Sequence, residues 1–191
     1  MHHKGLALTV ILALTGCTGL QLDDVASDTP AFDFQRYFEG HTRASGWFAD
    51  RFGKPRRHFC GDFIGTMDGD VLSLDETLFY TDKVVEKRVW RVTVGSDGEF
   101  KASSDSLIGD ALGQISGNGL QMRYTMAIGM PGGDEGTFDF NDFMLLQPDG
   151  SVHNITQVLK WGVRLGAVST QYARHDGSET CESRKPVGQS D

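Results

Sequence analysis

The chain has 191 residues, of which 39% are hydrophobic and 23% are charged, so it is neither a disordered polymer nor a protein with many membrane spans. Eighteen Lys and Arg against 26 Asp and Glu give a net charge of −8, which argues against a nucleic-acid partner because phosphate binding needs a basic face. The 24 glycines, together with 12 Phe, three Trp and four Tyr, suit a β protein with tight turns.

The first residues have the features of a bacterial lipoprotein signal. A short basic start ends at Lys4, and residues 5–14 form an apolar run that is too short for a membrane span of about 20 residues. The next four residues, Leu14-Thr15-Gly16-Cys17, resemble the bacterial lipobox. This resemblance implies that Cys17 carries a diacylglyceryl group and that the chain is cut just before it. The alternative is an ordinary secretory signal with a chance cysteine.

Residues 1–16 are therefore predicted to be a signal peptide, and residues 17–31 a flexible, polar tether. The acidic mature chain cannot be held on anionic lipid by its charge, so the acyl chains must anchor it. Thr18 stands where an Asp would favour the inner membrane. We therefore expect a lipid anchor in the cell envelope, at the outer membrane facing the periplasm in preference to the inner membrane.

Alternating apolar and polar residues predict a series of strands. The clearest period of two is in Leu120–Ile128, and Phe138–Leu146 repeats it with Asp142 as a polar interruption. Three further segments are rich in β-branched or aromatic residues and are predicted to be strands: Val71–Tyr80, Val84–Val94 and Val152–Lys160. Turn signals separate the strands: Met67–Asp70, Ser96–Gly98, Gly117–Gly119, Pro131–Asp134 and Pro148–Gly150.

These segments predict an all-β domain over residues 32–175, an antiparallel up-and-down meander of about eight to ten strands. Such a meander is expected to close into a lipocalin-like barrel, because closure removes exposed strand edges. Only Phe32–Phe38 and Ala111–Ile115 have room for a helical turn or two. Residues 176–191 are predicted to be a polar tail that is loose apart from Cys181.

Short motifs in order along the chain resemble one family of bacterial lipoproteins. They are Phe38-Glu39-Gly40, Asp50-Arg51-Phe52-Gly53-Lys54, Leu74-Asp75-Glu76, Arg88-Val89-Trp90-Arg91, Asp142-x-Met144-x-Leu146 and Gly162-Val163-Arg164-Leu165-Gly166. The family is catalogued as "domain of unknown function 3833", and the resemblance covers residues 38–168. It implies an amino-terminal lipid anchor and a lipocalin-like architecture, and it assigns no biochemical activity.

The sequence offers no catalytic, metal or cofactor motif, so we predict no catalytic residues, metal or cofactor. The histidines beyond the signal, His41, His58, His153 and His175, are scattered singly, without the spacing of metal ligands. A hydrolase elbow, a phosphate loop and a dinucleotide fingerprint are absent from the sequence. Pairs of carboxylates, which glycoside hydrolysis uses, are no evidence for that chemistry here, because 26 acidic residues always offer such pairs.

A barrel of this size can hold one small ligand. The candidate ligand-binding residues are Trp90, Arg91, Tyr124, Asp142, Asn154 and Lys160. Arg91 or Lys160 would hold an acidic lipid head at the mouth, while Asp142 and Asn154 orient it. The alternative is that Arg91 and Asp142 form a structural ion pair and that Trp90 is part of the core.

Two classes of function follow. The first is a binding module that holds or carries an apolar ligand, such as a fatty-acyl chain or a phospholipid, in the barrel. The second is a structural or accessory lipoprotein that supports an envelope complex through its outer surface. Cavity volume separates them, because a ligand site needs several hundred Å3 of free space.

The two remaining cysteines lie in an oxidising compartment if the chain is exported. Once Cys17 is acylated, Cys60 and Cys181 can form one disulfide. The alternative is a buried, inert Cys60 and a free thiol at Cys181 on the tail.

Overall fold

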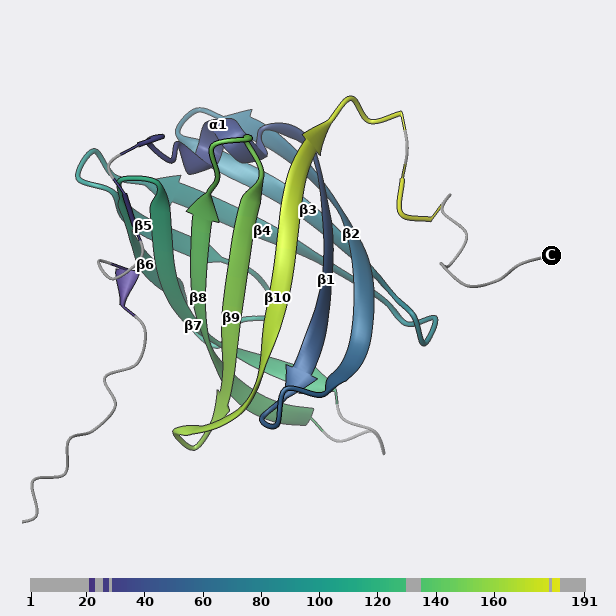
Figure 1. The fold of residues 1–191 in the computed structure, drawn as a ribbon. Helices are drawn as coiled ribbons and strands as arrows, with labels where there is room; N and C mark the ends of the chain where they lie inside the picture. The colour runs from purple at the N-terminus through teal and green to yellow at the C-terminus, as the bar shows by residue number, and fades with distance from the viewer. Residues whose placement is uncertain (1–20, 23–25, 28, 130–134, 179, 183–191) are drawn as a thin grey trace, which may run out of the picture.

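The structure is a computed structural model that describes residues 21–22, 26–27, 29–129, 135–178 and 180–182. Ten antiparallel strands form a closed barrel, and a single short helix precedes them in the described part of the chain (Figure 1). The elements are α1 (Phe34–Phe38), β1 (Gly40–Asp50), β2 (Pro55–Asp68), β3 (Val71–Tyr80), β4 (Val85–Val94), β5 (Glu99–Ser103), β6 (Ala111–Ser116), β7 (Gly119–Gly129), β8 (Glu135–Leu146), β9 (Val152–Lys160) and β10 (Val163–His175).

Each strand pairs with its neighbours in the sequence, and the last strand returns to the first. The closing pair, β1 with β10, runs antiparallel from His41 opposite His175 to Asp50 opposite Gly166. This closure leaves neither end of the meander as an exposed edge. The predicted all-β, up-and-down barrel is therefore confirmed.

The strand register follows from the turns that the sequence contains. Gly69, between β2 and β3, has a φ of 59°, and Gly150, between β8 and β9, has a φ of 80°. Glycine adopts such angles without the steric cost that a Cβ brings, so both hairpins can reverse tightly. The predicted turn Pro131–Asp134 lies outside the described residues.

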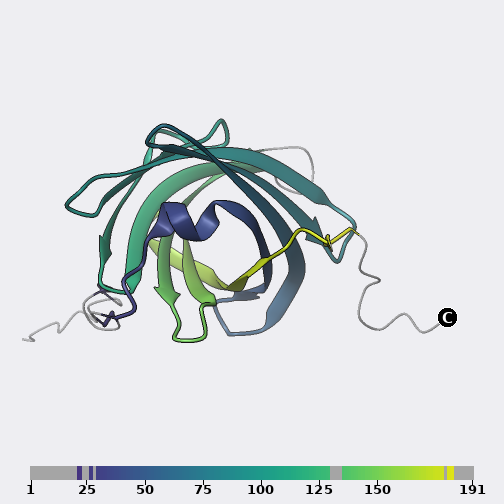
Figure 2. The same ribbon diagram turned by 90° about the horizontal axis from the view of Figure 1, so that it is seen from above.

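The helix α1 lies across the end of the barrel at which β1 begins (Figure 2). Its N-cap is Asp33, whose carboxylate accepts a hydrogen bond from the backbone N–H of Arg36 at 3.0 Å. Phe34, Tyr37 and Phe38 on this helix are buried. The helical turn expected within Phe32–Phe38 is thus present, and it directs aromatic side chains toward the interior.

The second segment with room for a helical turn, Ala111–Ile115, is a strand. In β6, Ala111 lies opposite Ala102 of β5, and Leu112 lies opposite Arg123 of β7. Two flanking strands supply the backbone hydrogen bonds of this segment, and this tertiary pairing outweighs a weak local preference for helix.

Cys60 of β2 is bonded to Cys181, and their Cα atoms are 5.6 Å apart. The backbone N–H of Cys181 also donates a hydrogen bond of 2.8 Å to Oδ2 of Asp62 in the same strand. Cys181 is buried. The part of the predicted tail around Cys181 is therefore fixed against the outer wall of the barrel.

Candidate ligand-binding site

The barrel encloses a cavity of about 750 Å3. At the α1 end it is bounded by Phe34, Phe38 and Phe100. At the opposite end it reaches Val84 and Lys87, which are exposed, so the cavity is connected to solvent there. Its walls are rich in aromatic and methionine side chains, among them Phe63, Met122, Met126, Phe138, Phe140 and Met144.

The period of two along each strand decides which candidate residues face the cavity. In β4, Trp90 is buried and lines the cavity, whereas Arg91 is exposed. Adjacent residues of a strand point to opposite faces of the sheet, so Trp90 and Arg91 cannot both face inward. Arg91 therefore lies on the outer face of the barrel and does not line the cavity, at whose mouth it was expected to hold a ligand head. The alternative ion pair between Arg91 and Asp142 is excluded for the same reason.

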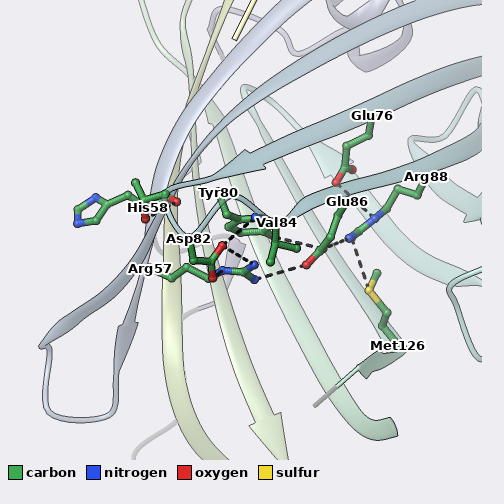
Figure 3. A network of polar contacts seen from close by, with 10 residues as sticks. Arg57, His58, Glu76, Tyr80, Asp82, Val84, Glu86, Arg88 and Met126 are labelled. Atoms are coloured by element: carbon green, nitrogen blue, oxygen red, sulfur yellow. Dashed lines mark hydrogen bonds and ion pairs between the residues drawn. The ribbon is translucent and has the colours of Figure 1, made fainter. Parts of the chain in front are cut away.

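Two arginines that line the cavity, Arg57 and Arg88, are both paired with acids (Figure 3). Arg57 contacts Asp82 at 2.8 Å and Glu86 at 3.4 Å. Arg88 contacts Glu86 at 2.7 Å and Glu76 at 3.4 Å. These five side chains form a charged network from the β3–β4 hairpin into the barrel, and they leave neither arginine unpaired.

Neutral side chains complete this network. The indole Nε1–H of Trp90 donates to Oε2 of Glu76 at 2.8 Å, and the Tyr80 hydroxyl donates to Glu86 at 3.2 Å. Burial raises the pKa of Glu76, although Arg88 beside it acts in the opposite direction. Burial disfavours the charge of Arg88, but Glu76 and Glu86 outweigh this and raise its pKa. The network thus joins two arginines to three carboxylates, and it extends from the half-exposed Asp82 to the buried Glu76.

A second polar cluster lies on the other side of the interior, on β7, β8 and β9. Asp142 and Asn154 are buried, with exposed fractions of 4% and 3%, and both line the cavity. The Tyr124 hydroxyl donates to Oδ2 of Asp142 at 3.4 Å, and Nδ2 of Asn154 donates to Oγ1 of Thr156 at 3.1 Å. Oδ1 of Asp142 and Oδ1 of Asn154 have no hydrogen-bond partner. The cluster therefore presents two buried acceptors that the protein leaves unfilled.

Burial raises the pKa of Asp142 from 3.8 to about 7. The nearby polar groups of Thr156, Asn154 and Tyr124 act in the opposite direction, and Glu76 adds to the increase. Asp142 is consequently able to exist as a neutral carboxylic acid near neutral pH.

Aromatic rings connect the two clusters. Tyr124 is stacked on Phe140, with ring centroids 5.0 Å apart and planes 6° apart. The ring of Trp90 meets Tyr124 edge to face at 5.6 Å. These rings lie between Glu76, which is bonded to Trp90, and Asp142, which is bonded to Tyr124.

Lys160 lies apart from the polar clusters. Its ammonium is 4.8 Å from the ring centroid of Phe138 and 5.0 Å from that of Trp161, a residue that is 90% exposed. Lys160 is six positions beyond Asn154 in β9, which is roughly 20 Å along a strand. The expected arrangement, in which Lys160 holds a head group that Asp142 and Asn154 orient, is therefore wrong.

Of the six predicted site residues, the structure brings four to the cavity: Trp90, Tyr124, Asp142 and Asn154. The sequence interpretation missed Glu76, Glu86 and Arg88. A signal for Glu76 was present, since it interrupts the inward, even-numbered series of β3 as Asp142 interrupts that of β8. Arg88 has the same parity as Trp90 in β4.

Two negative findings apply to the described residues alone. They contain no group of three or more His, Cys, Asp or Glu side chains placed to hold a metal ion. None of the helices formed by these residues has the length and apolar character needed to cross a bilayer.

Together, the closed meander and its large interior cavity define an up-and-down β-barrel of the kind that can enclose a small ligand. The chain belongs to the family described as "Protein of unknown function (DUF3833)", which it matches over residues 11–174. A comparison with curated proteins gave no match.

Proposed function

We propose that this protein is a lipid-anchored envelope protein whose barrel binds one apolar, chain-like ligand, such as a fatty-acyl chain or one chain of a phospholipid. The observation that carries the proposal is the cavity of about 750 Å3, which falls within the range of roughly 300–1,000 Å3 for small-molecule sites. Its wall of Phe, Tyr, Trp and Met side chains suits an apolar chain, and methionines adapt to varied ligand shapes.

The cavity counts against the second class of function, an accessory lipoprotein with a filled barrel. Natural protein interiors are packed at crystal-like density and contain few voids larger than a water molecule. A void of this size in the middle of an apolar wall is costly unless something occupies it. The exposed residues at one end give a ligand a route into the interior.

A substitution that fills the cavity tests the binding proposal. Val158 of β9 is buried and lines the cavity, and its neighbour Leu159 has the opposite strand parity and does not line it. We expect Val158→Trp to weaken the uptake of N-phenyl-1-naphthylamine, an uncharged dye that fluoresces in apolar surroundings, at least about tenfold, or about 1.4 kcal/mol. Leu159→Trp is the matched control and should bind the dye as the wild type does.

Native mass spectrometry of the protein purified from its own membrane would identify the natural ligand. We expect a bound apolar molecule at one copy per chain. If the protein carries no molecule and shows no saturable dye uptake, the accessory role is the better interpretation.

The membrane anchor has a separate test, because Cys17 lies outside the described residues. We expect the intact mass of membrane-extracted protein to correspond to a chain that starts at Cys17 and carries acyl groups. The Cys17→Ser variant should lose this added mass. A soluble product with an unmodified Cys17 would contradict the anchor without affecting the ligand proposal.

A further inference from the structure

The unfilled acceptors at the deep polar cluster identify the ligand's polar group. Asp142 and Asn154 are more than nine-tenths buried, and Oδ1 of each has no hydrogen-bond partner. Buried polar atoms in native proteins are nearly always hydrogen-bonded, because water that is removed from them must be replaced. Two such atoms that line one cavity are therefore the positions where a bound molecule would donate hydrogen bonds.

The register places these two atoms on neighbouring strands. Asp142 lies opposite Thr156, and Asn154 lies opposite Met144, two residues further along β8. Their side chains are thus diagonal neighbours on the inner face of the barrel. The Nδ2 donor of Asn154 is directed to Thr156, and the Tyr124 hydroxyl is directed to Asp142. One N–H of the Asn154 amide and the Tyr124 hydroxyl are thus engaged, and the Oδ1 atoms of Asp142 and Asn154 are left to accept hydrogen bonds from a ligand group between them.

The charges of the interior exclude an acidic head at this position. Arg57 and Arg88 are paired with acids of their own network, and Arg88 is held by both Glu76 and Glu86. A ligand carboxylate beside Asp142 would therefore meet acceptors and the nearby charge of Glu76 with no cation to balance it. An ammonium head would have to be moved from water into a largely apolar wall, which is costly.

We propose that Asp142 and Asn154 bind the neutral hydrogen-bond donor, a hydroxyl or a primary amide, of an apolar chain held in the barrel. This inference depends on the proposed function and specifies the ligand class. The chain enters from the end that Val84 and Lys87 line, with its donor group leading, and the apolar remainder lies against Tyr124, Phe140 and Trp90.

Four probes with the same chain length test the inference in the full chain at pH 7.5: dodecan-1-ol, dodecanamide, dodecanoic acid and methyl dodecanoate. Their affinities are measured by displacement of N-phenyl-1-naphthylamine. We expect the alcohol and the amide to bind at least about tenfold tighter than the acid and the ester. The acid presents a carboxylate at this pH, and the ester has no donor.

Asp142→Asn places a second amide in the cluster at nearly unchanged volume, and we expect it to reduce the preference for the alcohol over the acid at least about fivefold. Asn154→Leu removes the other acceptor and should weaken the alcohol while leaving the ester unchanged. The control is Asp139→Asn, because Asp139 lies on the same strand and is exposed. It should leave all four affinities as in the wild type.

The outcomes separate this inference from the proposed function. If none of the probes displaces the dye and the dye itself does not bind, the binding function fails. If the probes bind but the acid or the ester matches the alcohol, the barrel binds chains and the assignment of Asp142 and Asn154 is wrong. The melting temperature of each variant shows whether it folds. If either Asp142→Asn or Asn154→Leu does not fold, the affinities of the other variant test the assignment.

Discussion

Glu76 and Arg88 are directly opposite each other in the register of β3 and β4, and their side chains meet inside the barrel at 3.4 Å. Both lie in a wall whose other inward residues are mostly apolar, and the indole of Trp90 holds the second carboxylate oxygen of Glu76 at 2.8 Å. A buried pair of this kind is neutral as a unit, so its removal as a unit costs far less than the loss of one partner.

Removal of the Arg88 charge should therefore be strongly destabilising. In Arg88→Met the carboxylates of Glu76 and Glu86 lose their shared cation, and we expect the free energy of unfolding to fall by about 3–5 kcal/mol in urea titrations. The double variant Glu76→Gln/Arg88→Met should recover a large part of this loss.

The control is Arg91→Met, three residues further along the same strand and exposed. It should change stability by less than about 0.5 kcal/mol. Equal losses for Arg88→Met and Arg91→Met would show that the interior network contributes nothing specific.

Asp142 should make the protein less stable as the pH rises. Its pKa is about 7 in the folded protein, against roughly 3.9 for an unfolded chain, so between these values the native state holds a proton that the unfolded state has lost. The contribution of Asp142 to the free energy of unfolding is most favourable below about pH 4. It decreases by roughly 4 kcal/mol by the time the pH passes 7.

Asp142→Asn cannot lose this proton. We expect it to be more stable than the wild type at pH 8, with the difference disappearing near pH 4, when both are unfolded by urea. Because the pKa of Glu76 is also raised by burial, the wild-type profile contains a second contribution, and the difference between the two proteins isolates Asp142. A constant difference at all pH values would contradict the raised pKa.

The strands of the barrel could be predicted from the sequence because alternation is a local signal. Val71–Tyr80 and Val152–Lys160 match β3 and β9 as predicted. The same signal identifies Asp142 as an inward polar residue in β8. It should also have separated Trp90 from Arg91, since adjacent strand residues cannot share a face.

The ion pairs of the site, the position of α1 and the strand β6 depend on contacts between elements, and these contacts cannot be predicted from the sequence. The pairing of Glu76 with Arg88, and of Arg57 with Asp82, arises from the register of three neighbouring strands. The position of α1 across one end likewise depends on closure of the barrel. The strand at Ala111–Ser116 depends on its two partners, and its own residues carry too weak a signal to predict it.

The bond between Cys60 and Cys181 joins residues 121 apart, so its loss should be costly. In the chain-entropy description, closing a loop of this length stabilises the fold by about 4–5 kcal/mol. We expect Cys60→Ala/Cys181→Ala, unfolded in urea, to lose a stability of this order. Peptide mapping of natively purified protein without reductant should recover the two cysteine peptides joined. Two thiols that alkylate without reduction would contradict the bond.

The position of α1 can be tested at Gly65, near the end of β2, where the strand approaches Phe38, the last residue of the helix. A Cβ at Gly65 would overlap the carbonyl oxygen of Phe38, and it would also press on Leu72 at 3.1 Å. Backbone cannot move aside as a flexible side chain can, so Gly65→Ala should displace the end of α1 and lower the free energy of unfolding by about 1–3 kcal/mol.

The matched control for Gly65→Ala is Gly129→Ala, at the opposite end of the barrel, where a Cβ would meet no atom within 4 Å. It should leave stability within about 0.5 kcal/mol of the wild type. If α1 covers the cavity as described, Gly65→Ala should also accelerate dye exchange from the barrel, because Phe34 and Phe38 line that end. An unchanged exchange rate together with a large loss of stability would mean that the helix contributes to packing and does not control access.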